Sequence, residues 1–586
     1  MGTISDKLMR IINTKEDIRQ ALISKGYDVP TSIPFKEYAK MISDLPCRVD
    51  SFPDIEGIVA RYSALGLTNE QMATNPVWVD KTGNGHDLQM KNFAWKEGSG
   101  ISDIYPGALV FDGVDDYGTC DNFPVLTKEK GYTVVALRQW ISMGEGVSGL
   151  VSNVKNWFND GAFILEYNSN NATNKFVNRP VSFGKVNIEM DLPNNFTYQT
   201  SKSYKGVPIT TGSFKGTNSL FVGKINNIIG NRSNVAIWEL VFLDHDATEE
   251  ELTKIKDYFV KTYPWLFPDQ AWTVTGKTNE DEDRATIANI TGNGNDLVLS
   301  NFAFSGNSGY GSYVCNFNDT STWIYYSYNG TIEITSSTIH VTEAKTARPF
   351  LEKNASSGGY NKVKIKVTGI KDGEILKFMS DEDRDNTINI EKDGIYSLPG
   401  SDKLYYGFRL SNSTNTYPFN CDITIEQIPE YEGYLVTDGV DDKVVSAESI
   451  AFTDTWTIIT DTVFLGKVSV ASGILASNIF TVYNYQGSGT IAVTMGEGGS
   501  SLRVITSSIK AFSSDGTIYD AEWNEYHVEI GTIRALERLL KIGTSSNETS
   551  YFCQLAFKFL GIYNNQILSK DDCIKAYNYL QTLKAK

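Results

Sequence analysis

Beyond residue 50, apolar residues occur in short runs that alternate with polar residues and are interrupted by Gly, Asn, Asp and Ser. This pattern is typical of all-β sandwiches and barrels. In residues 362–367, Lys alternates with Val and Ile, which predicts an antiparallel strand with one face in water. Helical spacing occurs in residues 252–263 and 573–583, and each segment follows a hydroxyl residue, Thr248 or Ser569, that precedes an acid by three positions. We therefore expect a mainly β protein with two helices that pack along its sandwiches.

The first 50 residues have a different pattern, in which apolar residues recur at helical spacing. One helical stretch ends at Lys25-Gly26, and a second begins at Pro34 and ends before Pro46. So short a segment cannot bury much core by itself, so it must pack on a neighbour or on copies of itself. We interpret it as a docking or oligomerisation segment; the alternative is a helical cap on the first domain.

An internal repeat is the strongest organisational signal. Residues 82–88 recur as 291–297, which is 209 positions later, and residues 107–117 recur as 433–443, which is 326 positions later. The difference of 117 positions predicts that a domain is inserted in the second copy. The copies also end alike, since Trp238–Leu243 matches Phe557–Ile562.

These signals predict four units. They are a helical segment at 1–50, a sandwich at 51–266, a discontinuous second sandwich at 267–314 and 432–586, and an inserted β-sandwich of jelly-roll type at 315–431. A sandwich tolerates such an insertion in a loop because both ends of the inserted domain can lie close together.

Composition narrows the classes of function. The chain has 586 residues and a net charge of −17, which disfavours nucleic acid as a partner. Its apolar runs are too short for a membrane-spanning helix, and its first residues lack the pattern of a secretory signal, so we expect neither a membrane partner nor export by that route. The six cysteines have no C-x-x-C spacing and are expected to be free and mostly buried. The four histidines form no zinc motif.

The motif order resembles a known sandwich family. Asn-Gly-x-Asp-Leu, then Leu-Val-x-Asp-Gly-Val-Asp-Asp, then a strand such as Tyr132–Val135 and a terminal strand with a Thr-Glu-Glu-Glu helix looks like the concanavalin A-like (laminin G-like) lectin/glucanase fold. The opening segments 14–22, 25–26 and 34–38 are similar to the N-terminal segments of bacteriophage head and tail appendage proteins. Together these resemblances imply a virion fibre or decoration protein.

The sequence gives weak support for catalysis. Retaining glucanases need two carboxyl groups about 5 Å apart, and the closest match to their Glu-x-Asp-x-x-Glu pattern, at Glu189 and Asp191, lacks the third acid. There is also no Gly-x-Ser-x-Gly motif for a Ser nucleophile. We therefore predict that the protein is not an enzyme.

Acidic and aromatic residues supply the candidate ligand sites. The repeated Asp-Gly-Val-Asp-Asp motif predicts a tight turn, and the alternative is a calcium site formed by Asp112, Asp115, Asp116, Asp438, Asp441 and Asp442. Aromatic rings can stack against sugars or fill the core of a sandwich, and the candidates for stacking are Trp95, Trp323, Tyr325 and Tyr405.

The sequence as a whole predicts a non-enzymatic structural protein of a phage virion, assembled in the cytoplasm of a bacterial host, that adheres to cell-surface glycans. Its partners would be other virion proteins, bound through residues 1–50, and further copies of itself in a homodimer or homotrimer. No cofactor other than calcium is suggested. The alternatives are a virion brace that binds no sugar and a glycan-degrading enzyme.

Overall fold

The computed structural model describes most of the chain after residue 51. The described residues are 15, 19, 52–127, 129–142, 147–153, 164–168, 175–178, 186–189, 196–204, 206–208, 217–224, 232–311, 316–320, 322–354, 363–381, 387–399, 405–429, 431–465, 472–477, 480–484, 490–496, 501–506, 508–531, 537–544 and 552–585. The predicted helical segment 1–50 thus lies outside the described residues, except for Lys15 and Arg19, which are both helical. No helix among the described residues is long and apolar enough to cross a membrane.

The first sandwich consists of two eight-stranded antiparallel sheets, named here 1A and 1B. Sheet 1A has, in spatial order, β14 (Val207–Pro208), β13 (Ser203–Tyr204), β12 (Phe196–Thr200), β7 (Thr133–Ser142), β16 (Asn234–Leu243), β5 (Leu109–Asp112) and β4 (Gly100–Ile101), and β1 (Ile58–Ser63) also pairs with β16. Sheet 1B has β11 (Val186–Glu189), β10 (Lys175–Asn178), β9 (Ile164–Asn168), β8 (Val147–Ser152), β15 (Leu220–Val222), β6 (Tyr117–Cys120), β3 (Leu88–Lys91) and β2 (Val77–Trp78). A short helix, α3 (Asn69–Thr74), follows β1 and is capped by Thr68.

The alternation of apolar and polar residues explains how the two sheets pack. In β3, Leu88 and Met90 are buried in the core between the sheets, whereas Gln89 and Lys91 are exposed on the outer face. The same period of two holds in β6, and in β15 Leu220 and Val222 belong to the core between the sheets whereas Phe221 does not. Each sheet therefore buries one face in a shared apolar core.

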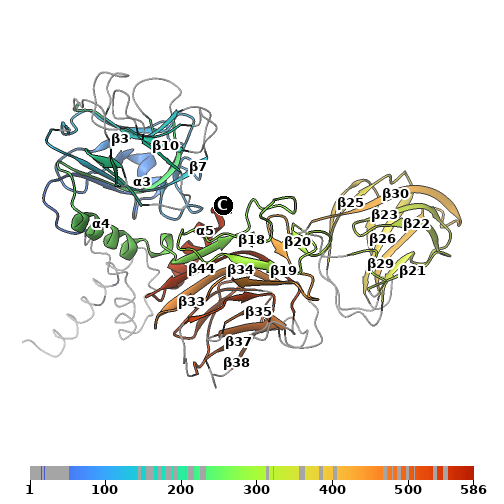
Figure 1. The fold of residues 1–586 in the computed structure, drawn as a ribbon. Helices are drawn as coiled ribbons and strands as arrows, with labels where there is room; N and C mark the ends of the chain where they lie inside the picture. The colour runs from blue at the N-terminus through green and yellow to red at the C-terminus, as the bar shows by residue number, and fades with distance from the viewer. Residues whose placement is uncertain are drawn as a thin grey trace, which may run out of the picture. The chain divides into compact units, whose positions relative to one another are not determined.

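The second sandwich repeats this plan with sheets 2A and 2B, each of eight strands. Sheet 2A has β20 (Gly309–Tyr310), β31 (Leu435–Val436), β44 (Leu555–Asn564), β34 (Trp456–Phe464), β39 (Ile509–Ser513), β40 (Thr517–Asp520) and β41 (Glu525–His527), and β17 (Gln270–Thr273) pairs with β44. Sheet 2B has β18 (Thr286–Ile287), β19 (Leu297–Ser300), β32 (Lys443–Ser446), β43 (Lys541–Ile542), β35 (Ser472–Ala476), β36 (Phe480–Asn484), β37 (Thr490–Met495) and β38 (Ser501–Ile505). A small pair, β33 (Ile450–Ala451) and β42 (Glu537–Arg538), lies outside both sheets. Figure 1 shows β34 and β44 in one layer and β35, β37 and β38 in the other.

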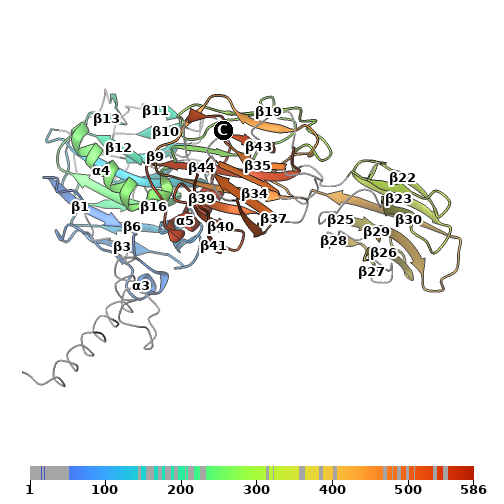
Figure 2. The same ribbon diagram turned by 90° about the horizontal axis from the view of Figure 1, so that it is seen from below.

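Between β20 and β31 the chain forms a third sandwich of two five-stranded sheets (Figure 2). One sheet has β21 (Trp323–Tyr325), β24 (Leu351–Lys353), β29 (Tyr405–Asn412), β26 (Glu374–Asp381) and β27 (Thr387–Ile390). The other has β22 (Gly330–Ile334), β23 (Thr338–Ala344), β30 (Phe419–Ile428), β25 (Val363–Thr368) and β28 (Gly394–Leu398). The eight strands from β23 to β30 have the strand order of a jelly roll, with β21 and β22 added at one edge of each sheet.

Two helices end the repeated modules, and both begin earlier than the sequence predicts. In the helix α4 (Glu249–Thr262), the ring of Tyr258 contacts that of Phe52, with ring centroids 4.8 Å apart. A 3-10 turn, η1 (Pro264–Leu266), follows it. The last helix, α5 (Lys570–Gln581), starts directly after Ser569, whose hydroxyl accepts a hydrogen bond from the amide of Asp572. The predicted starts at 252 and 573 were wrong by three residues, and in α5 the capping residue Ser569 lies immediately before the first helical residue.

The predicted fold class, mainly β with sandwiches, is confirmed. The described cysteines also fit the prediction, since Cys120, Cys421, Cys553 and Cys573 are free and buried.

Candidate functional site

The repeated motifs are structural turns, because the same hydrogen bonds recur in both copies. In the first copy, Asp80 Oδ1 accepts hydrogen bonds from the amides of Arg61 and Thr82, each at 3.0 Å. In the second copy, Asn289 Oδ1 accepts from the equivalent amides of Ala271 at 3.4 Å and Thr291 at 3.0 Å. The Gly-Asn-Gly segments therefore connect strands and form no phosphate-binding loop.

The Asp-Gly-Val-Asp-Asp motif builds a second conserved turn within the repeat. Asp112 Oδ1 accepts a hydrogen bond from the amide of Val114 at 2.7 Å, and Asp116 Oδ2 accepts one from the amide of Asp112 at 3.0 Å. In the second copy, Asp438 and Asp442 accept the corresponding bonds from Val440 and Asp438, at 2.7 and 2.8 Å. Gly113 and Gly439 have φ values of +77° and +76°, which glycine adopts without steric cost.

These bonds bear on the calcium alternative. One oxygen from each acid of a triplet lies within 4.8 Å of the others, both for Asp112, Asp115 and Asp116 and for Asp438, Asp441 and Asp442. Calcium takes six to eight oxygen ligands, however, and here the first and last carboxylates of each triplet already accept backbone hydrogen bonds. These hydrogen bonds explain why acids occupy these positions: their carboxylates stabilise the turn.

The last acid of each turn is buried and titrates unusually. Burial raises the pKa of Asp442 to about 7, and the nearby acids Asp438 and Asp441 add to the shift, whereas hydrogen bonds from the Asp438 amide and Ser308 oppose it. Burial likewise raises the pKa of Asp116 to about 6.

The structure also corrects the alignment of the terminal strands of the repeat. The amide of Ala64 donates to the carbonyl of Trp238, and the amide of Val274 donates to that of Lys558, both at 2.9 Å. Trp238 therefore corresponds to Lys558 and not to Phe557, a shift of one residue. Each of these residues lies at an irregularity in the pairing of its strand, which a comparison of apolar patterns does not reveal.

The predicted stacking aromatics differ in their environment. Trp323 is 3% exposed and packs against Phe317 and Tyr406 in the core of the inserted sandwich, so it cannot stack against a sugar and that prediction was wrong. Trp95 is half-buried, and its ring is stacked on that of Phe93 with centroids 4.8 Å apart. Tyr325 is 45% exposed and is available for stacking. The side chain of Tyr405 lies outside the described residues.

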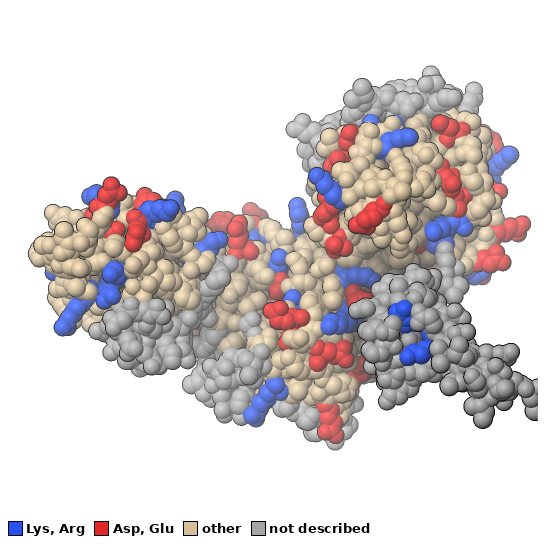
Figure 3. All heavy atoms as spheres, turned by 180° about the vertical axis from the view of Figure 1, so that it is seen from behind, with Lys and Arg blue, Asp and Glu red and all other residues tan. Residues whose placement is uncertain are grey.

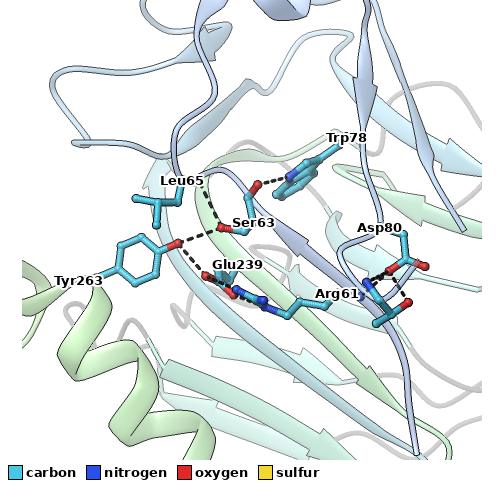
Figure 4. Close-up of polar contacts among 8 residues, drawn as sticks. Arg61, Ser63, Leu65, Trp78, Asp80, Glu239 and Tyr263 are labelled. Atoms are coloured by element: carbon cyan, nitrogen blue, oxygen red, sulfur yellow. Dashed lines mark hydrogen bonds and ion pairs between the residues drawn. The ribbon is translucent and has the colours of Figure 1, made fainter. Parts of the chain in front are cut away.

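A buried polar cluster joins β1, β16 and the segment after α4 (Figure 4). Arg61 Nε lies 2.9 Å from Glu239 Oε2, and the hydroxyl of Tyr263 donates to Glu239 Oε1 at 2.8 Å. Ser63 Oγ lies 3.3 Å from the same hydroxyl, and either oxygen can donate. Because the side chains of Arg61 and Glu239 are 5% and 0% exposed, this acid is sealed from substrate, and the cluster has a structural role.

A different cluster lies on the outer face of sheet 1B. The Lys224 Nζ is 3.4 Å from the centroid of the Tyr117 ring and 5.1 Å from that of Phe221, and the guanidinium carbon of Arg232 is 4.9 Å from the Tyr117 centroid. Lys224 and Arg232 are themselves paired in an antiparallel bridge. We call Tyr117, Phe221, Lys224 and Arg232 the cation cluster.

A glycine places Lys224 on this face. Leu220 and Val222 of β15 point into the core, so strict alternation would also send the side chain at 224 inward. Gly223 has φ +77°, and a Cβ there would meet the Phe111 ring. The chain is thus turned at Gly223, and Lys224 lies over the rings on the outer face.

The two cations of the cluster lack acidic partners. Within the part of the chain that the structure describes, no carboxylate pairs with Lys224 or Arg232, and Arg232 Nε and Nη1 are buried without an acceptor. Lys224 is only 4% exposed, and burial together with the like charge of Arg232 lowers its pKa to about 8. Buried cations are normally paired, because removing them from water is costly.

The second sandwich provides an internal comparison. Its equivalent positions follow from the shared pairing of Gly223 with Ser233 and of Gly543 with Cys553. The residues that correspond to Tyr117, Phe221, Lys224 and Arg232 are Lys443, Lys541, Thr544 and Phe552. The cation cluster is therefore a feature of the first sandwich and is not required by the fold.

Sequence reasoning missed the cation cluster although a signal was present. Leu220-Phe-Val-Gly-Lys and Leu540-Lys-Ile-Gly-Thr share the same Leu and Gly spacing, and aligning them would have shown Lys224 opposite Thr544. The candidate carboxylates are not tested, because the side chain of Glu189, in β11, and all of Asp191 lie outside the described residues.

Comparison with known proteins adds little. No family model and no curated protein matches the chain. A Trypanosoma rangeli sialidase in complex with sialic acid is 13% identical, with a TM-score of 0.26, over 36% of this chain and 34% of that one. The binding domain of botulinum neurotoxin serotype D/C is 10% identical, with a TM-score of 0.26, over 64% of this chain and 95% of that one. The match spans about a third of the sialidase, and likenesses this slight carry no argument about function.

Proposed function

We propose that this protein is a non-enzymatic structural and adhesive component of a phage virion, a head or tail fibre or decoration protein that binds surface glycans. The cation cluster carries the adhesive part of the proposal, because two sandwiches with the same turns differ at a group of aromatic and charged residues on one sheet face. A ligand site explains such a difference better than a purely structural role does, because two structural modules would need only the fold that both sandwiches share.

The virion part rests on the N-terminal segments 14–22, 25–26 and 34–38, which are similar to those of phage appendage proteins. In this role residues 1–50 dock the protein on the virion or join its copies. The two lectin-like sandwiches then face outward, as modules that meet a cell surface.

A glycan array probed with the full-length protein tests the adhesive role. Binding to at least one class of surface glycan is expected, and an array without any binding by the folded protein would favour the brace. The hydrolase alternative predicts depolymerisation of a bound glycan that is lost in Glu189→Ala. Binding without any cleavage product supports the non-enzymatic proposal.

A further inference from the structure

Three adjacent strands at the cation cluster contain no acidic residue. β3, β6 and β15 have the sequences Leu-Gln-Met-Lys, Tyr-Gly-Thr-Cys and Leu-Phe-Val, so none of them contributes a carboxylate. Lys91 is exposed in register with Tyr117 and adds a further cation to this outer face. On the side of the molecule seen in Figure 3, acidic and basic side chains are instead interspersed among uncharged residues.

Such a face is unusual in a chain with a net charge of −17. An acidic protein has many carboxylates with which to neutralise buried cations, and buried Arg61, for comparison, is paired with Glu239 at 2.9 Å. Arg232 Nε and Nη1 have no such acceptor. The positive charge of Arg232 and of the Lys224 ammonium beside it is complementary to an anionic group supplied from outside.

Resting on the proposed glycan binding, we propose that the cation cluster is a subsite for an anionic sugar, with Lys224 and Arg232 binding its charged group. The aromatic rings fit the same ligand. Tyr117 orients both cations through its ring face, and a sugar ring that carries a carboxylate or sulfate can contact the remaining aromatic surface through its C–H groups. Carboxylate and sulfate share the chemistry that the site recognises, and the experiment distinguishes them.

The test measures binding of the full-length protein to three oligosaccharide probes of similar length, namely oligogalacturonate, sulfated dextran and neutral dextran. The variant Lys224→Thr/Arg232→Phe places at both positions the residues that the second sandwich has there, so the scaffold tolerates them. Loss of charge-assisted hydrogen bonds should weaken binding of the preferred anionic probe by about 10- to 100-fold. Lys202→Thr, which removes an exposed lysine of the same sandwich, should bind like the wild type.

A charge-preserving variant separates binding from packing. Lys224→Arg/Arg232→Lys keeps both charges and should retain most of the binding, whereas a purely structural cluster would give no such rescue.

The outcomes separate this inference from the proposed function. If the array detects glycans but Lys224→Thr/Arg232→Phe and the wild type bind them equally, the subsite is refuted and adhesion stands. If neither the array nor the anionic probes bind the folded protein, both proposals fail. Preference for oligogalacturonate assigns a carboxylated sugar, and preference for sulfated dextran assigns a sulfated one.

Discussion

Removing Arg61 should weaken the first sandwich strongly. Arg61→Ala leaves the carboxylate of Glu239, which is 0% exposed, without its cation, although the hydroxyl of Tyr263 still donates to it. Breaking a buried ion pair by removing one partner costs about 3–5 kcal/mol. Because Arg61 and Glu239 lie on paired strands, β1 and β16, this cost should appear as easier local opening of these two strands.

The assay is native-state hydrogen exchange of the full-length protein, read by mass spectrometry on peptides from β1 and β16. A loss of about 3 kcal/mol raises the population of the open state by a factor of more than 100, so exchange of these amides should accelerate by that factor. Lys202→Ala, which removes an exposed ion pair with Asp246 in the same sandwich, should cause no measurable change.

The double variant Arg61→Met/Glu239→Leu is the decisive comparison. It removes both charges at similar volume, so exchange should return to within about tenfold of the wild type. The second sandwich indicates that the fold accepts apolar residues at these two positions, because the equivalent residues there are Ala271 and Phe559, which form no ion pair. The reasoning is refuted if Arg61→Ala accelerates exchange less than fivefold, or if the double variant is as unstable as the two single variants combined.

Four further outcomes are expected. Because burial raises the pKa of Asp442 to about 7, the folded state holds this proton more tightly than the unfolded state. The stabilisation is complete below about pH 4 and is lost as pH rises to about 7, a loss of about 4 kcal/mol, and Asp442→Asn should flatten this part of a denaturation profile. Calcium at millimolar concentration should shift the melting temperature by less than about 1 °C, since a larger rise would mark a bound ion. Gly369→Ala should destabilise the inserted sandwich by about 3 kcal/mol in a thermal melt, because Gly369 has φ +93° and a Cβ would collide with the carbonyl oxygen of Asp422; an unchanged melt contradicts this. Deleting residues 1–50 should convert a defined oligomer into a monomer of about 60 kDa in light scattering, and an oligomer that survives the deletion would exclude this segment as the assembly site.

The sequence predicted the parts of the fold that local pattern determines. Strand alternation predicted a strand at residues 362–367, where the structure has β25 (Val363–Thr368), and the repeated Gly and Asp positions identified turns that are the same in both copies. Ser569 was found as a helix cap because its hydroxyl and the acid three positions later form a recognisable pair.

What sequence could not supply was the direction of individual side chains. Trp323 and Tyr325 are two residues apart on β21, so they lie on the same face of the strand, yet the first is buried and the second is exposed. The difference arises because β21 is an edge strand, along which neighbouring residues cover one position and leave the next in water. Lys224 was missed for the same reason, since its position above the rings depends on the turn at Gly223 and not on alternation.

The inserted sandwich changes the chain entropy of its host. In the first sandwich the paired strands β4 and β5 are joined by residues 102–108, whereas the equivalent β20 and β31 are joined by residues 311–434, whose ends meet in a hydrogen bond between the amide of Gly311 and the carbonyl of Tyr434. Closing the longer loop from an unfolded chain costs about 2.5 kcal/mol more. A folded insert removes most of that cost, because it brings its own ends together before the host strands pair. The second sandwich therefore depends on a domain with which it shares no sheet, and melting the insert alone should loosen the hairpin from which it arises.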